Sequence, residues 1–503
     1  MSALKELVIL LERHKSEELE IWKSNNRKSN QGLLYQYYLK HPKVSDKDAC
    51  DYVYGKVTDS GKFRKLKSDL RDNLENLALF MKIKPKMNKD ATHELALINK
   101  EFAILQNLAM ASANLSLIDK GERLFEKVIR VGGATLMAKT TIKVLIGAKD
   151  IKTNKEKYVY YMQKSEELGK LLKLEEKAAI HYSTIQTWAS RTKASLKHRV
   201  PEIEAILTDF RKEKENLNSV VLDFYDLMLE LCVYSAANNH TKVFEQAQKG
   251  VTYFNELPFF HKDYVKSFHF YLIVGHGYRK EYAEAASYGA LNLEWIEEGT
   301  PSWLKTLELL TYAALRSTAY EAAVKHYLHA TKHELYESNS TPMMRDMFKV
   351  YFAQISLMQE GGRYVPSKEY ADLFKNKFRL GNFKNDLEIT EKDKSGLNVS
   401  VLFVDIAFEL IRGNADQISE RFEAIQKYLQ RYAEEEGSGR VYSYAKLLEL
   451  GIKYDWRVKK LKGEEFEPPL HHLQTTQVDI LNMRFEIEVL PYEEIWEFLL
   501  ERI

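Results

Sequence analysis

The chain has 503 residues, enough to bury a large core, and its 22 glycines and 10 prolines are too few for a loop-rich or disordered protein. Lys and Arg total 74 and Asp and Glu total 72, so the formal charge of +2 excludes a chain-wide basic surface for nucleic acid or membranes. Two cysteines cannot form a disulfide framework, and no segment is apolar for long enough to span a membrane, so we expect a cytoplasmic protein.

The first section, 1–90, is predicted to be helical and basic, with 19 Lys and Arg against 13 Asp and Glu. One leucine stripe predicts a first amphipathic helix through Leu4, Leu7, Leu10, Leu11 and Leu19. Ser45, with Asp48 three residues later, is suited to cap the start of a later helix. A lysine-rich loop, Lys82 to Lys89, is expected to close the section.

A basic helix is predicted over residues 61–81, after a short helix at 45–55 and a turn at Thr58 to Gly61. This order loosely resembles a helix-turn-helix, whose second helix can contact nucleic-acid phosphates. The cations that would make the contacts are Lys62, Arg64, Lys65, Lys67 and Arg71. Acidic residues dilute the second half of the helix, and it has no arginine/asparagine cluster to read base edges. A solvated basic face is the alternative interpretation.

The second section, 91–215, is expected to hold about six helical stretches that form degenerate hairpins. Gly132 and Gly133 are suited to end a helix, because glycine adopts the left-handed conformation at low cost. Pro201 suits the first turn of another helix, where its missing N–H is not needed.

The third section, 216–362, carries the strongest pattern, an aromatic residue three positions before an alanine that recurs at a constant spacing. The pairs are Phe244/Ala247, Tyr282/Ala285 and Tyr320/Ala323. A fixed period of about 38 residues indicates stacked helical hairpins, each of which buries its apolar face only against a neighbour. Thr300-Pro301 and Thr341-Pro342 both supply a capping hydroxyl and a first-turn proline. The expected helices are 220–237, 240–256, 264–278, 281–297, 302–316, 319–337 and 342–359.

The last section, 363–503, is acidic, with 20 Asp and Glu against 13 Lys and Arg over residues 401–503. Helices are predicted at 367–378, 398–413, 416–435 and 439–454, and Gly381 to Lys394 is expected to be a loop. Phe485 to Val489 alternates apolar and acidic residues, as a short extended segment does. Pro491 opens a last amphipathic helix that is expected to cap the stack.

One segment carries a family resemblance: Tyr320-Glu321-Ala322-Ala323, followed by Tyr327 and Ala330. Its spacing of small and aromatic residues resembles the second helix of a tetratricopeptide repeat. The resemblance covers about residues 220–345 and implies an all-α fold, a right-handed superhelix (α-solenoid) of antiparallel hairpins that binds a protein or peptide. The period is longer than that of the family, which is about 34 residues, and the family's Trp and Gly-Tyr signals and its clamp for peptide carboxylates are missing. Residues 490–496 are similar to bacterial tetratricopeptide-like proteins.

A partner-binding face is predicted on the first helices of successive hairpins. The candidates are Lys266 and His269 on one helix, Tyr312 and Arg316 on the next, and Arg345 and Lys349 on the third. A groove of tyrosines and cations suits an acidic or helical peptide. The assignment depends on which face of the superhelix is concave.

Three histidines, His326, His329 and His333, share one side of a helix and are the nearest approach to a metal-binding pattern. His326 and His333 are about 10 Å apart along the axis, so they do not easily share one zinc ion. We interpret them as a polar flank of the packing face and predict no metal. The chain also lacks a phosphate-binding loop, a hydrolase Gly-x-Ser-x-Gly and a metalloprotease His-Glu-x2-His, so we predict no catalytic residues and no cofactor.

Two functions follow from these patterns. The first is a non-enzymatic helical-repeat scaffold or adaptor that binds a protein or peptide. The alternative is a regulator whose basic N-terminal section contacts nucleic acid while the repeats sense a ligand or partner.

Overall fold

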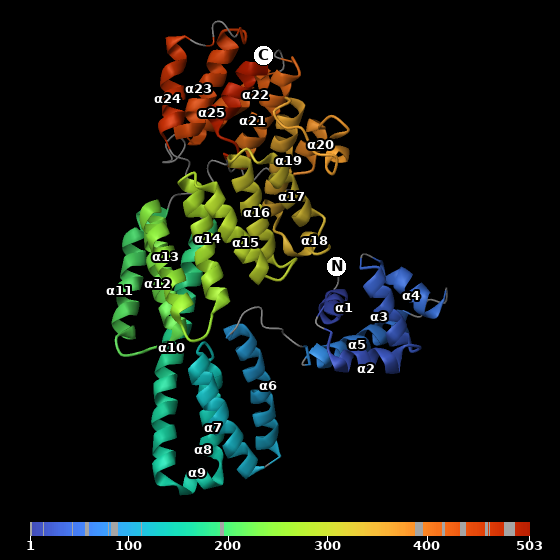
Figure 1. Cartoon of the computed structure of the whole chain (residues 1–503), viewed down its shortest axis with the longest axis vertical. Helices are drawn as coiled ribbons and strands as arrows, with labels where there is room; N and C mark the ends of the chain where they lie inside the picture. The colour runs from blue at the N-terminus through green and yellow to red at the C-terminus, as the bar shows by residue number, and fades with distance from the viewer. Residues whose placement is uncertain are drawn as a thin grey trace. The chain divides into compact units, whose positions relative to one another are not determined.

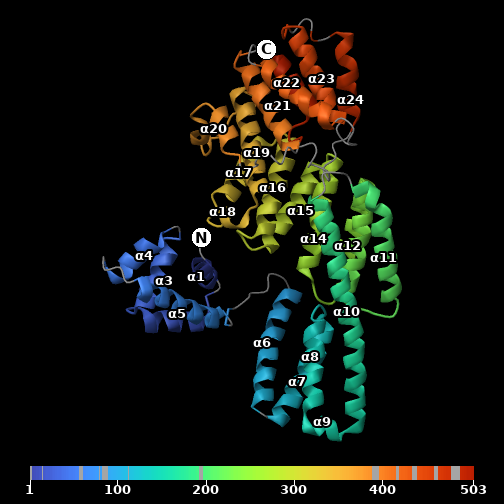
Figure 2. The ribbon, with the colours of Figure 1, turned by 180° about the vertical axis from the view of Figure 1, so that it is seen from behind.

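The computed structural model divides the chain into two compact units, Met1–Lys170 with Pro258–His261 and Leu171–Leu257 with Lys262–Ile503 (Figures 1 and 2). It describes residues 3–13, 15–42, 44–55, 60–78, 80–81, 89–111, 113–191, 196–387, 396–414, 418–432, 439–457, 461, 463–476 and 488–502. Within these residues all regular structure is helical, apart from one isolated bridge, and no helix is long and apolar enough to cross a membrane. The unit boundary lies inside one long helix, so the section predicted at 91–215 contributes to both units.

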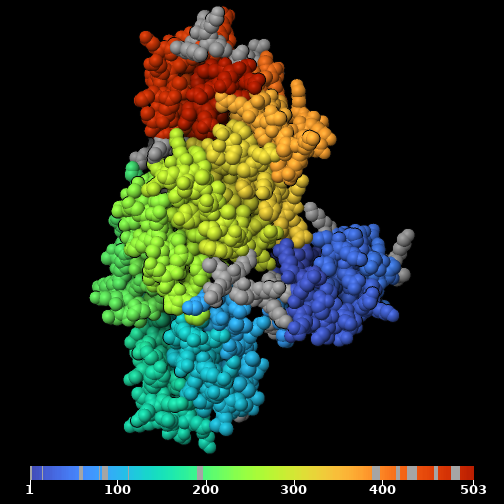
Figure 3. All heavy atoms as spheres, viewed as in Figure 1, coloured from blue at the N-terminus to red at the C-terminus, as the bar shows by residue number. Residues whose placement is uncertain are grey.

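The first unit begins with a cluster of five helices that has its own apolar core. They are α1 (Ala3–Arg13), α2 (Glu17–Asn26), α3 (Asn30–Lys40), α4 (Asp46–Tyr54) and α5 (Ser60–Ala78). Helices α1, α3 and α5 contact one another, and α2 and α4 pack against α3. Leu34, Tyr35 and Leu70 are fully buried among them. In the space-filling view the atoms of these helices, coloured blue, form one continuous mass (Figure 3).

The single first helix expected through Leu19 is wrong, because the chain divides it into α1 and α2. Ser16 caps α2: its Oγ accepts a hydrogen bond from the Leu19 N–H, with 3.0 Å between the two heavy atoms. Acidic residues in the first turn of α2 add a favourable charge beside the helix N-terminus. The cap predicted at Ser45 is confirmed, since its Oγ accepts from the Asp48 N–H at 3.2 Å.

The rest of the first unit is an up-and-down array of helices. It contains α6 (Ala91–Met110), α7 (Asn114–Val131), α8 (Thr135–Gly147), α9 (Lys149–Thr153) and the first part of α10 (Lys155–Arg191). Gly132 and Gly133 take φ angles of 75° and 76° between α7 and α8, as the predicted helix end requires. A backbone bridge from Asp90 to Phe260 attaches segment 258–261 to this unit.

The second unit continues α10 and then forms hairpins whose helices each contact the next along the chain. After the turn η1 (Leu196–Arg199), the helices are α11 (Val200–Lys214), α12 (Val220–Ala236), α13 (His240–Glu256), α14 (Lys262–Tyr278), α15 (Tyr282–Trp295), α16 (Pro301–Arg316), α17 (Tyr320–Thr331), α18 (Tyr336–Asn339) and α19 (Pro342–Glu360). Pro201, Pro301 and Pro342 open helices as predicted, and Thr300 and Thr341 supply the predicted capping hydroxyls.

The C-terminal part of this unit adds a second group of packed helices. They are the turn η2 (Ala371–Phe374), α20 (Leu380–Asn385), α21 (Gly396–Ile411), α22 (Ile418–Tyr432), α23 (Gly439–Lys453), the turn η5 (Glu464–Phe466), α24 (Glu467–Thr475) and α25 (Tyr492–Arg502). One continuous apolar core extends from α14 to α25, and Trp303 and Trp496 are its largest fully buried side chains. The predicted last helix is confirmed as α25, which contacts α21, α23 and α24.

The helix predicted at 367–378 is wrong, because only the turn η2 forms there. Here side chains take the place of helical hydrogen-bond partners for the backbone. The Phe378 N–H donates to the Glu360 carboxylate, and the Phe378 carbonyl accepts from Arg412. The predicted loop from Gly381 contains most of α20, and residues 388–394 of it lie outside the described residues. The turn at 56–59, the loop at 82–88 and the alternating residues 485–487 also lie outside them.

One tight turn recurs between paired helices of the second unit. It places one residue in the left-handed region, joined by Trp456 in the turn at Asp455, and the N–H of the residue after the first bonds back to the carbonyl five residues before it. This is the Schellman arrangement, which satisfies carbonyls at a helix C-terminus. In the described part of the unit, the left-handed residues of these turns are Asn238, Lys280, Thr318, Gly362, Gly413 and Asp455.

The turns within the hairpins follow the constant spacing of the sequence pattern between the second and third hairpins but not between the first and second. The left-handed residues of their turns are Asn238, Lys280 and Thr318, so the first interval is longer than the second by about one turn of α-helix. Counted from its turn, Ala247 accordingly lies one helical turn further along its helix than Ala285 and Ala323 do. A full turn restores the direction of a side chain, so all three alanines still point inward and are fully buried. The constant spacing therefore marks equivalent positions in the second and third hairpins, whereas the pair in the first hairpin lies one turn further from its turn.

Candidate functional site

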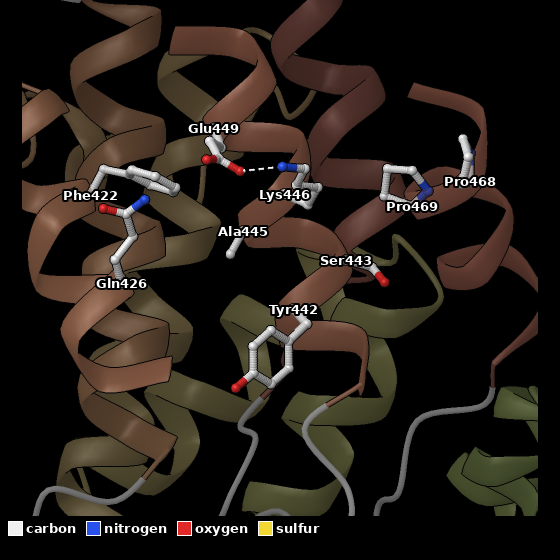
Figure 4. Close-up of a pocket in the computed structure, with 9 residues that line it drawn as sticks. All are labelled: Phe422, Gln426, Tyr442, Ser443, Ala445, Lys446, Glu449, Pro468 and Pro469. Atoms are coloured by element: carbon white, nitrogen blue, oxygen red, sulfur yellow. Dashed lines mark hydrogen bonds and ion pairs between the residues drawn. The ribbon is translucent and has the colours of Figure 1, made fainter. Parts of the chain in front are cut away.

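An open groove lies over α23, between α22 and α24 (Figure 4). Its floor follows the i, i+3, i+4, i+7 spacing of one helix face: Tyr442, Ala445, Lys446 and Glu449. Tyr444 and Leu448 lie on the opposite face of α23 and are fully buried in the core. Because its apolar face packs into the core, α23 directs the residues of the groove floor toward solvent.

Two neighbouring helices form the walls of the groove. Phe422 and Gln426, one turn apart on α22, line one side, and Pro468 and Pro469 line the other (Figure 4). The prolines fit the start of α24 because a first helical turn needs no N–H there. The groove has a volume of about 440 Å³, within the range of sites that hold a ligand or a few side chains of a partner.

The polar groups of the groove include an ion pair and a contact between a hydroxyl and an imidazole. Lys446 Nζ lies 2.6 Å from Glu449 Oε2, and both side chains are about half exposed. Ser443 Oγ lies 2.9 Å from His472 Nδ1 on α24. Burial raises the pKa of Tyr442 above its ordinary value, and its hydroxyl is neutral at pH 7. The groove thus combines rings, an ion pair and a hydroxyl on one surface.

The contact between Ser443 and His472 lacks the other parts of a nucleophilic site. Acyl transfer by serine needs a histidine that a third group orients, usually a carboxylate. His472 donates no hydrogen bond to a carboxylate among the described residues, and its ring lies beside Gly439.

Three of the six residues predicted to form a partner-binding face are buried: His269, Tyr312 and Arg316. His269 Nδ1 lies 2.9 Å from Asn292 Oδ1, and its ring stacks on Trp295. Burial lowers the pKa of His269. The expectation of an exposed face fails for these three side chains, because α14 and α16 are packed between neighbouring helices on both sides.

The other three residues of the predicted face are partly exposed and have local partners. Lys266 pairs with the aspartate one turn before it. Arg345 donates to the Ser340 carbonyl over 2.8 Å, and Lys349 Nζ lies 3.0 Å from Asp346 Oδ1. Of the six residues predicted to form the partner-binding face, these three are accessible to a partner, and their role in binding stays a prediction.

Arg316 instead takes part in a buried ion network with the C-terminal part of the chain. Its Nη1 lies 3.1 Å from Glu488 Oε1, and Arg440 Nε lies 2.7 Å from Glu488 Oε2. The three side chains are at most 4% exposed. Arg440 also pairs with Glu493, and the Tyr492 N–H donates to Glu488. The network ties α16, α23 and α25 together.

Sequence analysis missed both the groove and the network. Pro468 and Pro469 signal a helix start, but which face of α23 stays open depends on how α22 and α24 pack. For Glu488 a signal was available, since it stands between apolar residues in the alternating segment. An acidic side chain between buried apolar neighbours is itself buried only when a cation pairs with it, and the sequence does not identify that cation.

The three histidines considered for metal binding, two in α17 and one just after it, do not converge on one point. The rings of His329 and His333 both pack on Trp303, with centroid distances of 4.8 and 5.1 Å. His333 Nδ1 accepts a hydrogen bond from the Leu335 N–H. Burial lowers the pKa of His326 to about 4, so its ring is neutral at pH 7. Among the described residues, no three His, Cys, Asp or Glu side chains are arranged to hold a metal ion.

The predicted basic residues lie on the first three turns of α5. Lys67 is half-buried, and its Nζ lies 2.5 Å from Asp46 Oδ2 at the start of α4. The other four side chains are exposed: Lys62, Arg64, Lys65 and Arg71. The structure therefore places these cations on one short stretch of helix.

No model of a known protein family matches the chain. No curated protein matches it, and no solved structure does.

Proposed function

We propose that this chain is a non-enzymatic helical-repeat scaffold that binds a segment of another protein in the groove over α23. The observation that carries the proposal is the outward face of α23 with a helix on each side (Figure 4). A groove of this kind accepts an amphipathic helix, which inserts side chains at i, i+3 or i+4, and i+7. Phe422 and Tyr442 supply the rings that commonly anchor such a segment.

The finer fold belongs to the same proposal: a right-handed superhelix of tetratricopeptide-like hairpins. Three features support it, namely the recurring turn, the packing of each helix on the next, and small residues where neighbouring helices meet. Gly250 lies against the Phe268 ring, and Gly289 lies against Leu310 of the following hairpin. The intervals between successive turns make these hairpins longer than the repeat of that family, which has about 34 residues.

The charge of the C-terminal part favours a basic partner. Residues 401–503 carry 20 Asp and Glu and 13 Lys and Arg, a net charge of −7. This potential attracts a positively charged segment and repels an acidic one. We therefore expect an amphipathic helix with one large apolar side chain over Tyr442 and basic residues at its edges.

Blocking the groove tests the proposal. Gln426 is exposed and lines the groove, so Gln426→Trp fills the space without disturbing the core. Glu423 is exposed on the same helix but does not line the groove, and Glu423→Trp is the matched control. Proteins retained from native lysate by each immobilised variant are quantified by mass spectrometry.

The expected result is a retained protein that is lost with Gln426→Trp and kept with Glu423→Trp. A synthetic peptide from that protein should then bind the purified wild-type chain in calorimetry and bind the Gln426→Trp chain at least tenfold more weakly, a difference of about 1.4 kcal/mol. Identical sets of retained proteins for both variants would exclude the groove as the binding site.

A further inference from the structure

Helix α5 presents a basic surface that is unrelated to the α23 groove. Its buried stripe repeats at i, i+3, i+7 and i+11 and consists of Phe63, Leu66, Leu70 and Leu74. Helices α1 and α3 contact α5 and share this core, which fixes the rotation of α5 about its axis. Arg64 and Arg71, two turns apart, are exposed on the outer side. Packing thus holds these cations toward solvent.

The first half of this helix has a larger positive net charge than the whole chain. Residues 62–71 contain five Lys and Arg and one Asp, a net charge of +4, whereas all 503 residues sum to +2. The rest of the chain is therefore close to neutral. We propose that the exposed face of α5 binds the sugar–phosphate backbone of duplex DNA.

A phosphate backbone fits this face better than a membrane surface does. Binding in a membrane interface needs large apolar side chains beside the cations, and the outer side of α5 between Arg64 and Arg71 carries Ser68. Arginine also matches phosphate oxygens with two parallel hydrogen bonds. Asp72 and Glu75 confine the contact to the first three turns of the helix.

The frame around α5 supports the same partner. Helix α4 precedes α5 directly, and the ion pair between Lys67 and Asp46 holds the start of α4 against α5. Helices α4 and α5 both contact α3, and in a helix-turn-helix protein the second of two such consecutive helices is the one that meets DNA. Residues 60–72 contain no Asn or Gln to pair with adenine, and contacts of Arg64 and Arg71 to phosphates carry no sequence information, so we expect binding with little sequence preference.

The number of exposed cations sets the expected salt dependence. Four cations neutralise at most about four phosphates, so log K should fall against log salt with a slope no steeper than about −3.6. The affinity should lie in the range of non-specific complexes, with a Kd of about 1–100 µM at physiological salt.

The experiment measures fluorescence anisotropy of a labelled random-sequence duplex as the full-length chain is added, at about 50 to 200 mM NaCl. The test variant is Arg64→Gln with Arg71→Gln. Arg123 and Arg130 have the same seven-residue spacing on α7 and are also exposed, so replacing both with Gln is a control with equal charge change. Circular dichroism confirms that each variant keeps its helical content.

We expect the wild-type chain to bind, the α5 variant to reduce the salt slope by about 2, and the α7 variant to leave it unchanged. Lys65→Gln is a second α5 variant, with an expected reduction of about 1. The proposal is overturned if no anisotropy change occurs at the lowest salt, or if the α5 and α7 variants weaken binding equally. Binding to vesicles of phosphatidylserine without binding to the duplex would also overturn it.

Discussion

Replacing Glu488 with glutamine tests whether the buried network holds the C-terminal helices on α16. The amide keeps the size of the side chain but removes the negative charge that Arg316 and Arg440 share. Removing one partner of a buried ion pair costs about 3–5 kcal/mol, because a buried charge is left uncompensated. Arg440 keeps its pair with Glu493, so we expect the lower end of this range, about 3 kcal/mol.

The control for this change is Glu449→Gln in the groove. The ion pair of Glu449 with Lys446 is about half exposed, so its loss should cost at most about 1 kcal/mol. Unfolding in urea is followed by tryptophan fluorescence, because the rings of Trp456 and Trp496 lie 6.2 Å apart in the C-terminal core. The urea midpoint should fall markedly for Glu488→Gln and little for Glu449→Gln.

Equal urea midpoints for the two variants would refute the assigned role of Glu488. The double variant Arg316→Leu with Glu488→Leu gives a second check. It removes a charge of each sign together, and apolar replacement of a buried pair is often neutral or stabilising. It should therefore unfold at a higher urea concentration than Glu488→Gln does, and a lower midpoint would contradict the argument.

Thr318 and Gly413 both have left-handed backbones, so Thr318→Gly should raise the free energy of unfolding by about 1 kcal/mol and Gly413→Ala should lower it by about 1 kcal/mol. Gly413 has open space around it, so the added methyl group of alanine causes no clash. If the two substitutions moved the urea midpoint in the same direction, the shared turn would be contradicted. His326 has a pKa of about 4 when folded and about 6.5 when unfolded, so the unfolded chain binds the proton more readily and stability falls as pH drops below about 6.5. The loss attributable to His326 at pH 5 is about 2 kcal/mol, and His326→Gln should narrow the difference between urea midpoints at pH 7 and pH 5. Gly289→Ala should cost about 1–3 kcal/mol through a clash with Leu310, visible as a lower melting temperature.

Helix positions between 220 and 360 could be predicted because the signals there are local. Thr300 and Thr341 cap helices with their own hydroxyls, and the proline after each threonine fits the first turn. The same kind of signal was overlooked at Ser16, which ends the first predicted helix early. The segment 367–378 was missed because its backbone bonds go to Glu360 and Arg412, which local sequence patterns do not reveal.

The binding face could not be predicted because exposure depends on distant partners. His269 and Arg316 both look like surface residues in sequence, yet their hydrogen-bond partners lie 23 and 172 residues further along the chain. A polar residue on a helix between two others is buried when such a partner is present. The basic residues of α5 were predictable in contrast, because Phe63 and Leu70 alone fix which side of the helix is covered.

The link from Arg316 to Glu488 also sets an order for folding during synthesis. A ribosome adding about 5–20 residues per second needs roughly 10–30 s to make the 172 residues that separate the two. Throughout that time the nascent chain contains α16 but not the carboxylate that neutralises its arginine. The early hairpins can dock on one another as they emerge, whereas the later half of the second unit reaches its final packing only when translation has passed the glutamate.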